Sequence, residues 1–230
     1  MKQDTINIGL PSKGRLKKDT ISLLKKNGLK IFSERGERDL FGKIKKYPNL
    51  KIIFLHAREC IEALSIGTID LCISGVDLLE ESEINIRNKI KILKKYEFGK
   101  ATLVLSIPDQ WIDVQTLLDL DEVADEFKKK KKRFLRVSTK YENLTRKFLY
   151  SKGVTQFQIV KSLGSTEVAP FTGTAEIISD ITSTGATLKA NNLRILKDGE
   201  ILKSQACLMQ SKLSIKKKGI KNIIRVLSKK

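Results

Sequence analysis

The chain has 230 residues, of which 40% are hydrophobic and 31% charged, and its formal net charge at pH 7 is +19. This length suits one large domain or two small ones, and the composition is that of a folded, soluble protein. No stretch approaches the roughly 20 apolar residues of a membrane-spanning helix. The first seven residues lack the apolar core of a signal peptide, so we expect a cytoplasmic protein without a membrane partner.

The cysteines and the single histidine argue against a metal site. Cys60, Cys72 and Cys207 lie far apart in apolar runs, and His56 is the only histidine. No Cys-x-x-Cys pair occurs, so the pattern predicts buried free thiols rather than a zinc site or a disulfide framework.

The positive charge is mostly lysine, spread along the whole chain. Its densest runs are five lysines at residues 128–132 and three at residues 216–218, and aromatic side chains alternate with neither run. Single-stranded nucleic acids are usually bound by basic grooves that also carry aromatic stacking platforms. We therefore favour a solvated lysine-rich surface with no nucleic-acid partner, although such a surface attracts polyanionic small substrates.

The predicted elements of the first half alternate between strands and helices. A strand at 6–10 leads through a turn at 11–14 into a helix over about 16–27, which Gly28 ends. A strand at 51–55, a helix at 59–66 and a strand at 69–75 follow. This order predicts a mostly parallel sheet flanked by helices.

A second unit begins near residue 101. It has predicted strands at 101–107, 134–138, 157–160 and 175–180, a charged, solvent-facing helix at 119–132, and a helix at 141–152 that Gly153 ends. We predict two small α/β lobes with a central cleft, which is a common place for ligands.

The segment at residues 180–188 carries the most specific chemical pattern. Asp180 ends the predicted strand at 175–180, and the carboxyl ends of parallel strands face the crevice where α/β proteins bind ligands. A carboxylate there can accept hydrogen bonds from two adjacent ribose hydroxyls. The amides around Gly185 and the neighbouring hydroxyl groups can hold a 5′-phosphate; the hydroxyl groups belong to Thr182, Ser183, Thr184 and Thr187.

The alternative is a plain strand–turn–helix junction in which Ser and Thr only cap the helix. Caps account for one or two of these residues, so we favour the phosphate site. The absence of Gly-Lys-Ser/Thr excludes a Walker loop. The arrangement Asp-x-x-Ser-Thr-Gly-x-Thr resembles the phosphoribosyl-pyrophosphate loop of the phosphoribosyltransferases.

Several blocks together resemble the ATP phosphoribosyltransferase family, whose members catalyse the first step of histidine biosynthesis. The blocks occur in the family's order, and the resemblance covers about residues 5 to 211. They are Leu-Pro-Ser-Lys-Gly-Arg-Leu at 10–16, Ile-Asp-Leu-Cys-Ile-Ser-Gly-Val-Asp-Leu-Leu at 69–79, Thr-Lys-Tyr-Glu-Asn-Leu-Thr-Arg at 139–146 with Leu-Gly-Ser-Thr-Glu-Val-Ala-Pro at 163–170, and residues 180–188.

The resemblance implies a type II periplasmic-binding-protein-like fold of two α/β lobes. Residues 1–98 and 190–230 would form lobe I, on the ATP side, and residues 99–189 would form lobe II with the donor loop. Only some twenty residues follow the apolar segment at 206–209, so the chain resembles the short form, which has no C-terminal regulatory domain. Short forms work with a regulatory subunit similar to a histidyl-tRNA synthetase, and a homodimer is expected.

By resemblance, N1 of the ATP adenine attacks C1 of phosphoribosyl pyrophosphate and expels pyrophosphate. Mg²⁺ would be carried by the substrate phosphates, with no metal site of the protein's own. The protein must chiefly align two anionic substrates and stabilise the charge that builds on the leaving group. This requirement agrees with a sequence that lacks a nucleophilic triad.

The donor-binding residues would be Asp180 for the ribose diol and five residues for the 5′-phosphate, namely Ser183, Thr184, Gly185, Ala186 and Thr187. ATP would be bound by Lys13, Gly14, Arg15, Asp77 and Glu167. Alternatives stay open for several of these. Lys13 and Arg15 also suit an ordinary basic helix start, Asp77 also suits a helix cap, and Glu167 also suits a structural contact within its lobe.

Arg38 and Arg58 are the candidate catalytic residues at the leaving pyrophosphate. Arg58 is the weaker of the two, because His56 stands nearby where many family members have arginine. We expect His56 to be a packed residue and Tyr141 to be structural, although a tyrosine at that place can also stack on adenine. Two other functions remain as alternatives: a non-catalytic binding module of the periplasmic type, and a nucleic-acid-binding protein suggested by charge alone.

Overall fold

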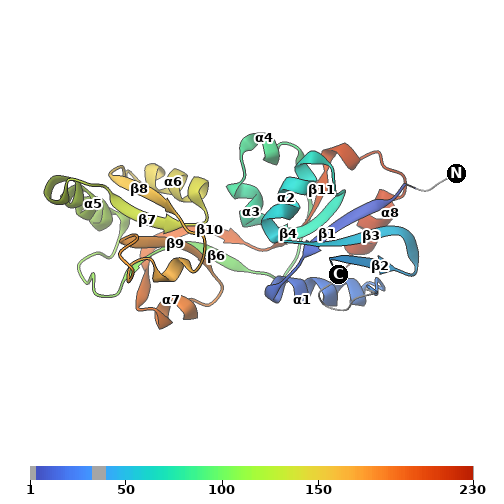
Figure 1. Cartoon of the computed structure of the whole chain (residues 1–230), viewed down its shortest axis with the longest axis horizontal. Helices are drawn as coiled ribbons and strands as arrows, with labels where there is room; N and C mark the ends of the chain where they lie inside the picture. The colour runs from blue at the N-terminus through green and yellow to red at the C-terminus, as the bar shows by residue number, and fades with distance from the viewer. Residues whose placement is uncertain (1–3, 33–39, 230) are drawn as a thin grey trace. The chain divides into compact units, whose positions relative to one another are not determined.

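The computed structural model describes residues 4–32 and 40–229 (Figure 1). The chain forms two compact units. Unit 1 comprises Met1–Lys100 and Gln205–Lys230, and unit 2 comprises Ala101–Ser204. Among the described residues, no helix combines the length and the apolar character that crossing a membrane requires.

Unit 1 is built on a six-stranded sheet in the order β2-β3-β1-β4-β11-β5. Its strands are β1 (Ile6–Pro11), β2 (Phe41–Ile44), β3 (Tyr47–Leu55), β4 (Leu71–Gly75), β5 (Ile90–Lys95) and β11 (Ala206–Ser211). Its helices are α1 (Gly14–Lys26), α2 (Ala57–Ile66), α3 (Val76–Glu81), α4 (Ile84–Arg87) and α8 (Ile220–Leu227), and η3 (Lys212–Ser214) is a 3-10 turn.

Only the centre of this sheet is parallel. Strand β1 pairs parallel with β3 and β4, whereas β2, β11 and β5 are joined to their neighbours antiparallel. The prediction of a mostly parallel sheet is therefore wrong, and the sheet is mixed. The cause is topological, because β2 and β3 form a hairpin and β11 enters the sheet only after the chain has passed through unit 2.

Two apolar clusters cover unit 1's sheet. One gathers residues of β1 with α1 and α8, and the other gathers residues of α2, β4 and β11. A central strand covered on both faces is expected to be mainly apolar, as β1 is apart from Asn7. Cys60, Cys72 and Cys207 belong to the second cluster as buried free thiols, which confirms that prediction.

Unit 2 has a five-stranded sheet in the order β10-β6-β9-β7-β8. The strands are β6 (Ala101–Pro108), β7 (Leu135–Thr139), β8 (Phe157–Lys161), β9 (Ile177–Thr182) and β10 (Leu193–Ser204). The helices are α5 (Leu117–Lys131), α6 (Glu142–Ser151) and α7 (Ala186–Ala190), with the 3-10 turn η2 (Thr166–Val168). Strand β7 is parallel to β8 and β9, and β6 is antiparallel to β9 and β10.

The chain returns from unit 2 to unit 1 at Gln205, whereas the resemblance placed this return at residue 190. The difference is strand β10, which pairs with β6 from Leu193 to Ser204 and so extends unit 2 by that strand. Helix α5 also differs from its prediction as a solvent-facing helix, because Leu117, Leu120 and Ala124 on one of its faces are buried.

Candidate active site

In unit 2, the predicted donor residues lie where three parallel strands end. The register pairs Thr139 of β7 with Lys161 of β8 and with Ser179 of β9. Lys140 and Asp180 therefore directly follow paired residues toward the carboxyl ends of these strands. Open α/β sheets bind ligands in the crevice outside the carboxyl ends of their strands.

Asp180 lies inside β9 rather than at its end. The strand continues to Thr182 because β6 still pairs with it there, with Val104 opposite Asp180. The parallel ladder with β7, however, stops at Ser179. Asp180 is thus the first β9 residue beyond its parallel neighbour, and its side chain is partly buried.

The carboxylate of Asp180 is only partly stabilised by its surroundings. Its Oδ1 accepts a hydrogen bond of 2.9 Å from the amide of Ile181. Burial raises the pKa of Asp180, the Ile181 amide and the charge of Lys140 lower it, and the charge of Glu167 raises it. Burial is the largest of these effects. Among the described residues the Ile181 amide is the hydrogen-bond donor to this carboxylate, so Oδ2 can accept further bonds.

Three buried hydroxyl groups lie in the strands and helix next to Asp180. Thr145 of α6 donates to Ser179 Oγ at 2.8 Å, and its hydroxyl lies 3.5 Å from that of Thr139. Thr139 Oγ1 in turn accepts from the amide of Tyr141 at 2.9 Å. This network ties β7, α6 and β9 together beside Asp180, and the sequence pattern did not single it out.

The loop after β9 is organised by its own hydroxyl groups. Thr182 Oγ1 accepts from the amide of Gly185 at 2.9 Å, and Thr184 Oγ1 accepts from the amide of Ala186 at 3.3 Å. Gly185 precedes α7 with φ of +74°, which only glycine adopts without strain. Ser183, Thr184, Ala186 and Thr187 are exposed.

Glu167 and Tyr141 occupy different environments in unit 2. Glu167 lies in η2, half-buried, and its charge reaches Asp180. Glu167 therefore lies near Asp180 within the same unit. Tyr141 is buried at the start of α6, which favours the structural interpretation of this side chain.

In unit 1, three turns follow the carboxyl ends of the parallel strands β1, β3 and β4. Pro11 is paired with Leu55, and the amide of Ser12 donates to the Leu55 carbonyl at 2.8 Å. The hydroxyl of Ser74 in β4 donates to the carbonyl of Ala57 at 3.1 Å. This end of the sheet collects the turn of Lys13 and Arg15, the start of α2, and Asp77.

The turn after β1 is exposed and cationic. Lys13 precedes α1 without capping it through its side chain, and no acidic residue occupies the helix's first turn. Gly14 has φ of +77°. Arg15 donates to the carbonyl of Lys100 at 3.3 Å, which holds the guanidinium beside the turn.

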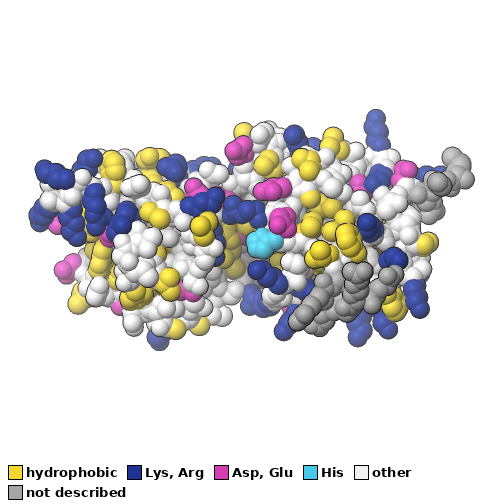
Figure 2. All heavy atoms as spheres, viewed as in Figure 1, with side chains coloured by type: hydrophobic (Ala, Val, Ile, Leu, Met, Phe, Trp, Pro, Cys, Tyr) yellow, Lys and Arg dark blue, Asp and Glu magenta, His cyan; other side chains and the backbone are white. Residues whose placement is uncertain are grey.

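His56 is exposed, so the expectation of a packed histidine is wrong. It precedes α2, where its amide donates to Glu59 Oε2 at 3.0 Å. The chain's only histidine is visible on the surface in Figure 2. Arg58 is exposed in the first turn of the same helix, and Arg38 lies outside the described residues.

Asp77 is 5% exposed in the first turn of α3. The residue before this helix is Gly75, so Asp77 lies one position inside the helix and is not its cap residue. A carboxylate in the first turn still interacts favourably with the helix dipole. The helix-cap alternative for Asp77 is therefore wrong, and its contact with ATP stays a prediction.

Comparison with known proteins decides the family. The family model of HisG, described as ATP phosphoribosyltransferase, matches residues 56–229. An ATP phosphoribosyltransferase of Chelativorans sp. is 45% identical over 209 residues, which are 90% of this chain and 91% of the relative. The chain belongs to the ATP phosphoribosyltransferase family. Its activity is therefore transfer of the phosphoribosyl group from phosphoribosyl pyrophosphate to N1 of ATP, with release of pyrophosphate, in the first step of histidine biosynthesis.

Solved structures confirm the fold. The ATP phosphoribosyl transferase (HisG:HisZ) complex from Thermotoga maritima matches with a TM-score of 0.72 and 24% identity over 96% of each chain. The alkanesulfonate-binding protein SsuA of Xanthomonas axonopodis matches with a TM-score of 0.56 and 15% identity over 99% of this chain and 73% of that one. This phosphoribosyltransferase thus has a periplasmic-binding-protein-like fold.

Within residues 4–32 and 40–229, no group of three or more His, Cys, Asp or Glu residues is arranged to hold an ion. Members of the family need a metal ion for activity. Oxygen atoms at the candidate site come from Asp180, Glu167 and the hydroxyl loop, which are ligand types that hard divalent cations accept.

Proposed function

We propose that unit 2 binds phosphoribosyl pyrophosphate through Asp180 and the loop that follows it. The single observation that carries the proposal is the position of Asp180, one residue beyond the parallel ladder and with acceptor capacity unused. Two ribose hydroxyls can donate to this carboxylate. The desolvated position strengthens such charge-assisted bonds.

The loop offers the 5′-phosphate a set of donors at a preformed turn. The amides of Gly185 and Ala186 are satisfied by the hydroxyl oxygens of Thr182 and Thr184, which are neutral acceptors. A phosphate dianion is a stronger acceptor for these amides, and the released hydroxyls can then donate to it. Ser183, Thr184 and Thr187 are exposed and accessible to the ligand.

Unit 1 would bind ATP through the turn of Lys13, Gly14 and Arg15, with Asp77 in the first turn of α3, which follows β4. Two cations on an exposed turn suit a triphosphate, and the left-handed Gly14 leaves the backbone uncovered. Arg58 would stabilise charge on the leaving pyrophosphate. Glu167, whose charge reaches Asp180, would orient the bound substrate rather than bind ATP alone.

The transfer needs alignment more than acid–base catalysis. The lone pair of adenine N1 forms the new bond to C1 of the ribose while the bond from C1 to the pyrophosphate oxygen breaks, and the electron pair leaves with pyrophosphate. Mg²⁺ bound to the pyrophosphate oxygens would neutralise this charge. Because magnesium commonly enters sites with substrate phosphates and one or two carboxylates, Asp180 and Glu167 are the protein groups that fit it.

Assembly follows from the same proposal. The chain would act as a homodimer in the cytoplasm, together with a regulatory subunit of the histidyl-tRNA-synthetase-like kind. The structural relative from Thermotoga maritima is a complex of HisG with HisZ, which supports this partner.

The test is a direct assay of product formation. The chain is mixed with ATP, phosphoribosyl pyrophosphate and magnesium, with and without the regulatory subunit, and absorbance of the N1-substituted adenine is followed in the near ultraviolet. We expect turnover that chelation abolishes and magnesium restores. Lack of turnover under every combination would contradict the proposal.

A further inference from the structure

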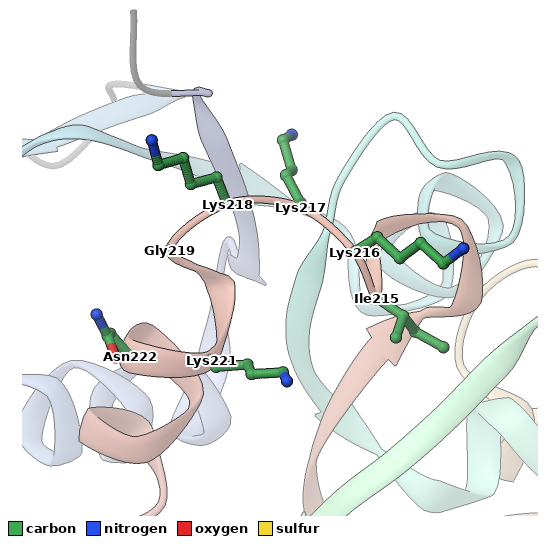
Figure 3. Close-up of a pocket in the computed structure, with 7 residues that line it drawn as sticks. All are labelled: Ile215, Lys216, Lys217, Lys218, Gly219, Lys221 and Asn222. Atoms are coloured by element: carbon green, nitrogen blue, oxygen red, sulfur yellow. The ribbon is translucent and has the colours of Figure 1, made fainter. Parts of the chain in front are cut away.

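A cavity in unit 1 is lined by four of the chain's lysines (Figure 3). Its volume is about 470 Å³, and it lies at the loop between η3 and α8. The lining residues are Ile215, Lys216, Lys217, Lys218, Gly219, Lys221 and Asn222. None of these seven residues is acidic or aromatic, and none belongs to the proposed substrate-binding turns.

One of the lysines anchors the loop. Lys217 Nζ lies 2.7 Å from Oδ2 of Asp70, a residue that is 2% exposed. The same carboxylate accepts from the hydroxyl of Ser214 at 2.5 Å and from the amide of Asn7 at 2.8 Å. The loop is therefore fixed to the core of unit 1, so the backbone that carries the neighbouring lysines is held in place.

The other three lysines carry uncompensated charge. Lys216, Lys218 and Lys221 are exposed, and within the described part of the chain none of them forms an ion pair with a carboxylate. In Figure 3 the Lys221 side chain runs from α8 beneath the loop toward Ile215. The first turn of α8 has no acidic residue either, so the described residues of unit 1 offer no carboxylate contact that relieves the repulsion among these ammonium groups.

The lysine run at residues 128–132 shows that a lack of nearby partners is not a general property of the chain's lysines. On α5, Lys130 pairs with Glu126 at 2.9 Å and Lys129 with Asp125 at 3.8 Å. Lys128 lies over the ring of Phe134, and Lys131 over that of Phe127. Those lysines have partners within their own unit, whereas Lys216, Lys218 and Lys221 have no ion-pair partner among residues 4–32 and 40–229.

We propose that this cavity binds a linear oligophosphate anion. Lysine ammonium groups are compact phosphate-binding charges, and three of them around one cavity, two on the loop and Lys221 on α8, match a chain with several negative groups. Asn222 adds an amide donor at the cavity wall. Since no aromatic ring lines the cavity, it has no platform for a nucleobase, and recognition rests on the phosphate chain itself.

Lysine acetylation with and without inorganic tripolyphosphate, read by mass spectrometry at physiological salt, tests the site on the whole chain. We expect at least fivefold protection of Lys218 and Lys221 and no protection of the lysines at 128–131. Lys13 reports separately on the proposed ATP turn, so failure there leaves this inference intact. Equal protection of both lysine runs, or none at the cavity, would overturn it.

Two matched variants complete the test. Lys216→Gln/Lys218→Gln/Lys221→Gln keeps the Lys217 anchor, and Lys128→Gln/Lys129→Gln/Lys130→Gln changes the net charge equally. By calorimetry, the first should weaken tripolyphosphate binding at one site at least tenfold and leave transferase turnover unchanged, whereas the second should behave as wild type. Equal weakening in both, or a single-stranded RNA that protects both runs alike, would show generic attraction and overturn the proposal.

Discussion

The turn after β1 in unit 1 and the loop after β9 in unit 2 share a backbone design but differ in chemistry. Each contains a left-handed glycine, Gly14 with φ of +77° and Gly185 with φ of +74°, and each leads into a helix. The first presents two exposed cations and no side-chain cap. The second presents a carboxylate and hydroxyl groups, and two of the hydroxyl oxygens accept hydrogen bonds from amides of the same loop. Side chains, rather than the turn, would therefore distinguish the proposed triphosphate site from the proposed sugar-phosphate site.

The largest expected effect is on the carboxylate. Asp180→Ala removes the acceptor of two ribose hydroxyls, and hydrogen bonds to charged groups each contribute roughly 1.5–3 kcal/mol. Steady-state kinetics should show kcat/KM for phosphoribosyl pyrophosphate lowered about 100-fold, which is ~2.7 kcal/mol, with KM for ATP little changed. Asp125→Ala on α5 is the control and should retain wild-type kinetics. Wild-type kinetics in Asp180→Ala would refute the ribose role.

The two glycines sharpen the comparison directly. An added Cβ meets no atom within 4 Å at Gly14 or at Gly185, so alanine introduces only backbone strain, about 1–2 kcal/mol. We expect Gly185→Ala to raise KM for phosphoribosyl pyrophosphate about tenfold and Gly14→Ala to raise KM for ATP by a similar factor. Each variant should leave the KM of the other substrate near its wild-type value.

Gly153→Ala is the matched control for both, because Gly153 has φ of +85° with the same open space but lies after α6. It should lower the melting temperature without changing either KM. If all three variants altered the two KM values alike, the assignment of the turns to separate substrates would be wrong.

A smaller effect is expected from the cations after β1. Arg15→Gln removes a charge and the hydrogen bond to the Lys100 carbonyl, so KM for ATP should rise about three- to tenfold, as for exposed phosphate contacts worth on the order of 1 kcal/mol. Because exposed charges are screened, the effect should shrink as salt increases. An equal rise of KM for phosphoribosyl pyrophosphate would contradict the division of roles.

The smallest effect concerns stability and pH. Burial raises the pKa of Asp180, so between its unfolded and folded pKa values the folded state binds more protons, and stability falls as pH rises through that window. Asp180→Asn removes this penalty. Denaturant unfolding should find the variant at least as stable as wild type at pH 7, with the difference disappearing in acid; a variant less stable at pH 7 only would contradict the sign.

Local patterns predicted much of the fold, whereas the donor site stays a prediction. Glycines after α1 and α6 mark helix ends as expected, since Gly28 and Gly153 both have positive φ. The pairing of β10 and β11 depends on strands far away in the sequence, so alternation along the chain did not reveal it. That is why the parallel character was overestimated and the return to unit 1 was placed too early.

The environment of Asp180 could not be predicted from the sequence, because it is formed by segments that lie far apart along the chain. Its position inside β9 depends on β6, which pairs with the strand from the other side. Lys140 is brought near it by the register of β7 and β9, and Thr145 bonds to Ser179, the residue before Asp180, only because α6 packs there. The sequence block at residues 139–146 contains Lys140 and Thr145, but nothing in it pointed to Ser179 or to the hydroxyl network.

A crystal structure of the enzyme with bound phosphoribosyl pyrophosphate tests the central claim most directly. The ribose hydroxyls should lie within hydrogen-bond distance of Asp180, with the 5′-phosphate on the amides of Gly185, Ala186 and Thr187. A donor whose 5′-phosphate lay on Lys13, Gly14 and Arg15, with its ribose away from Asp180, would contradict the account.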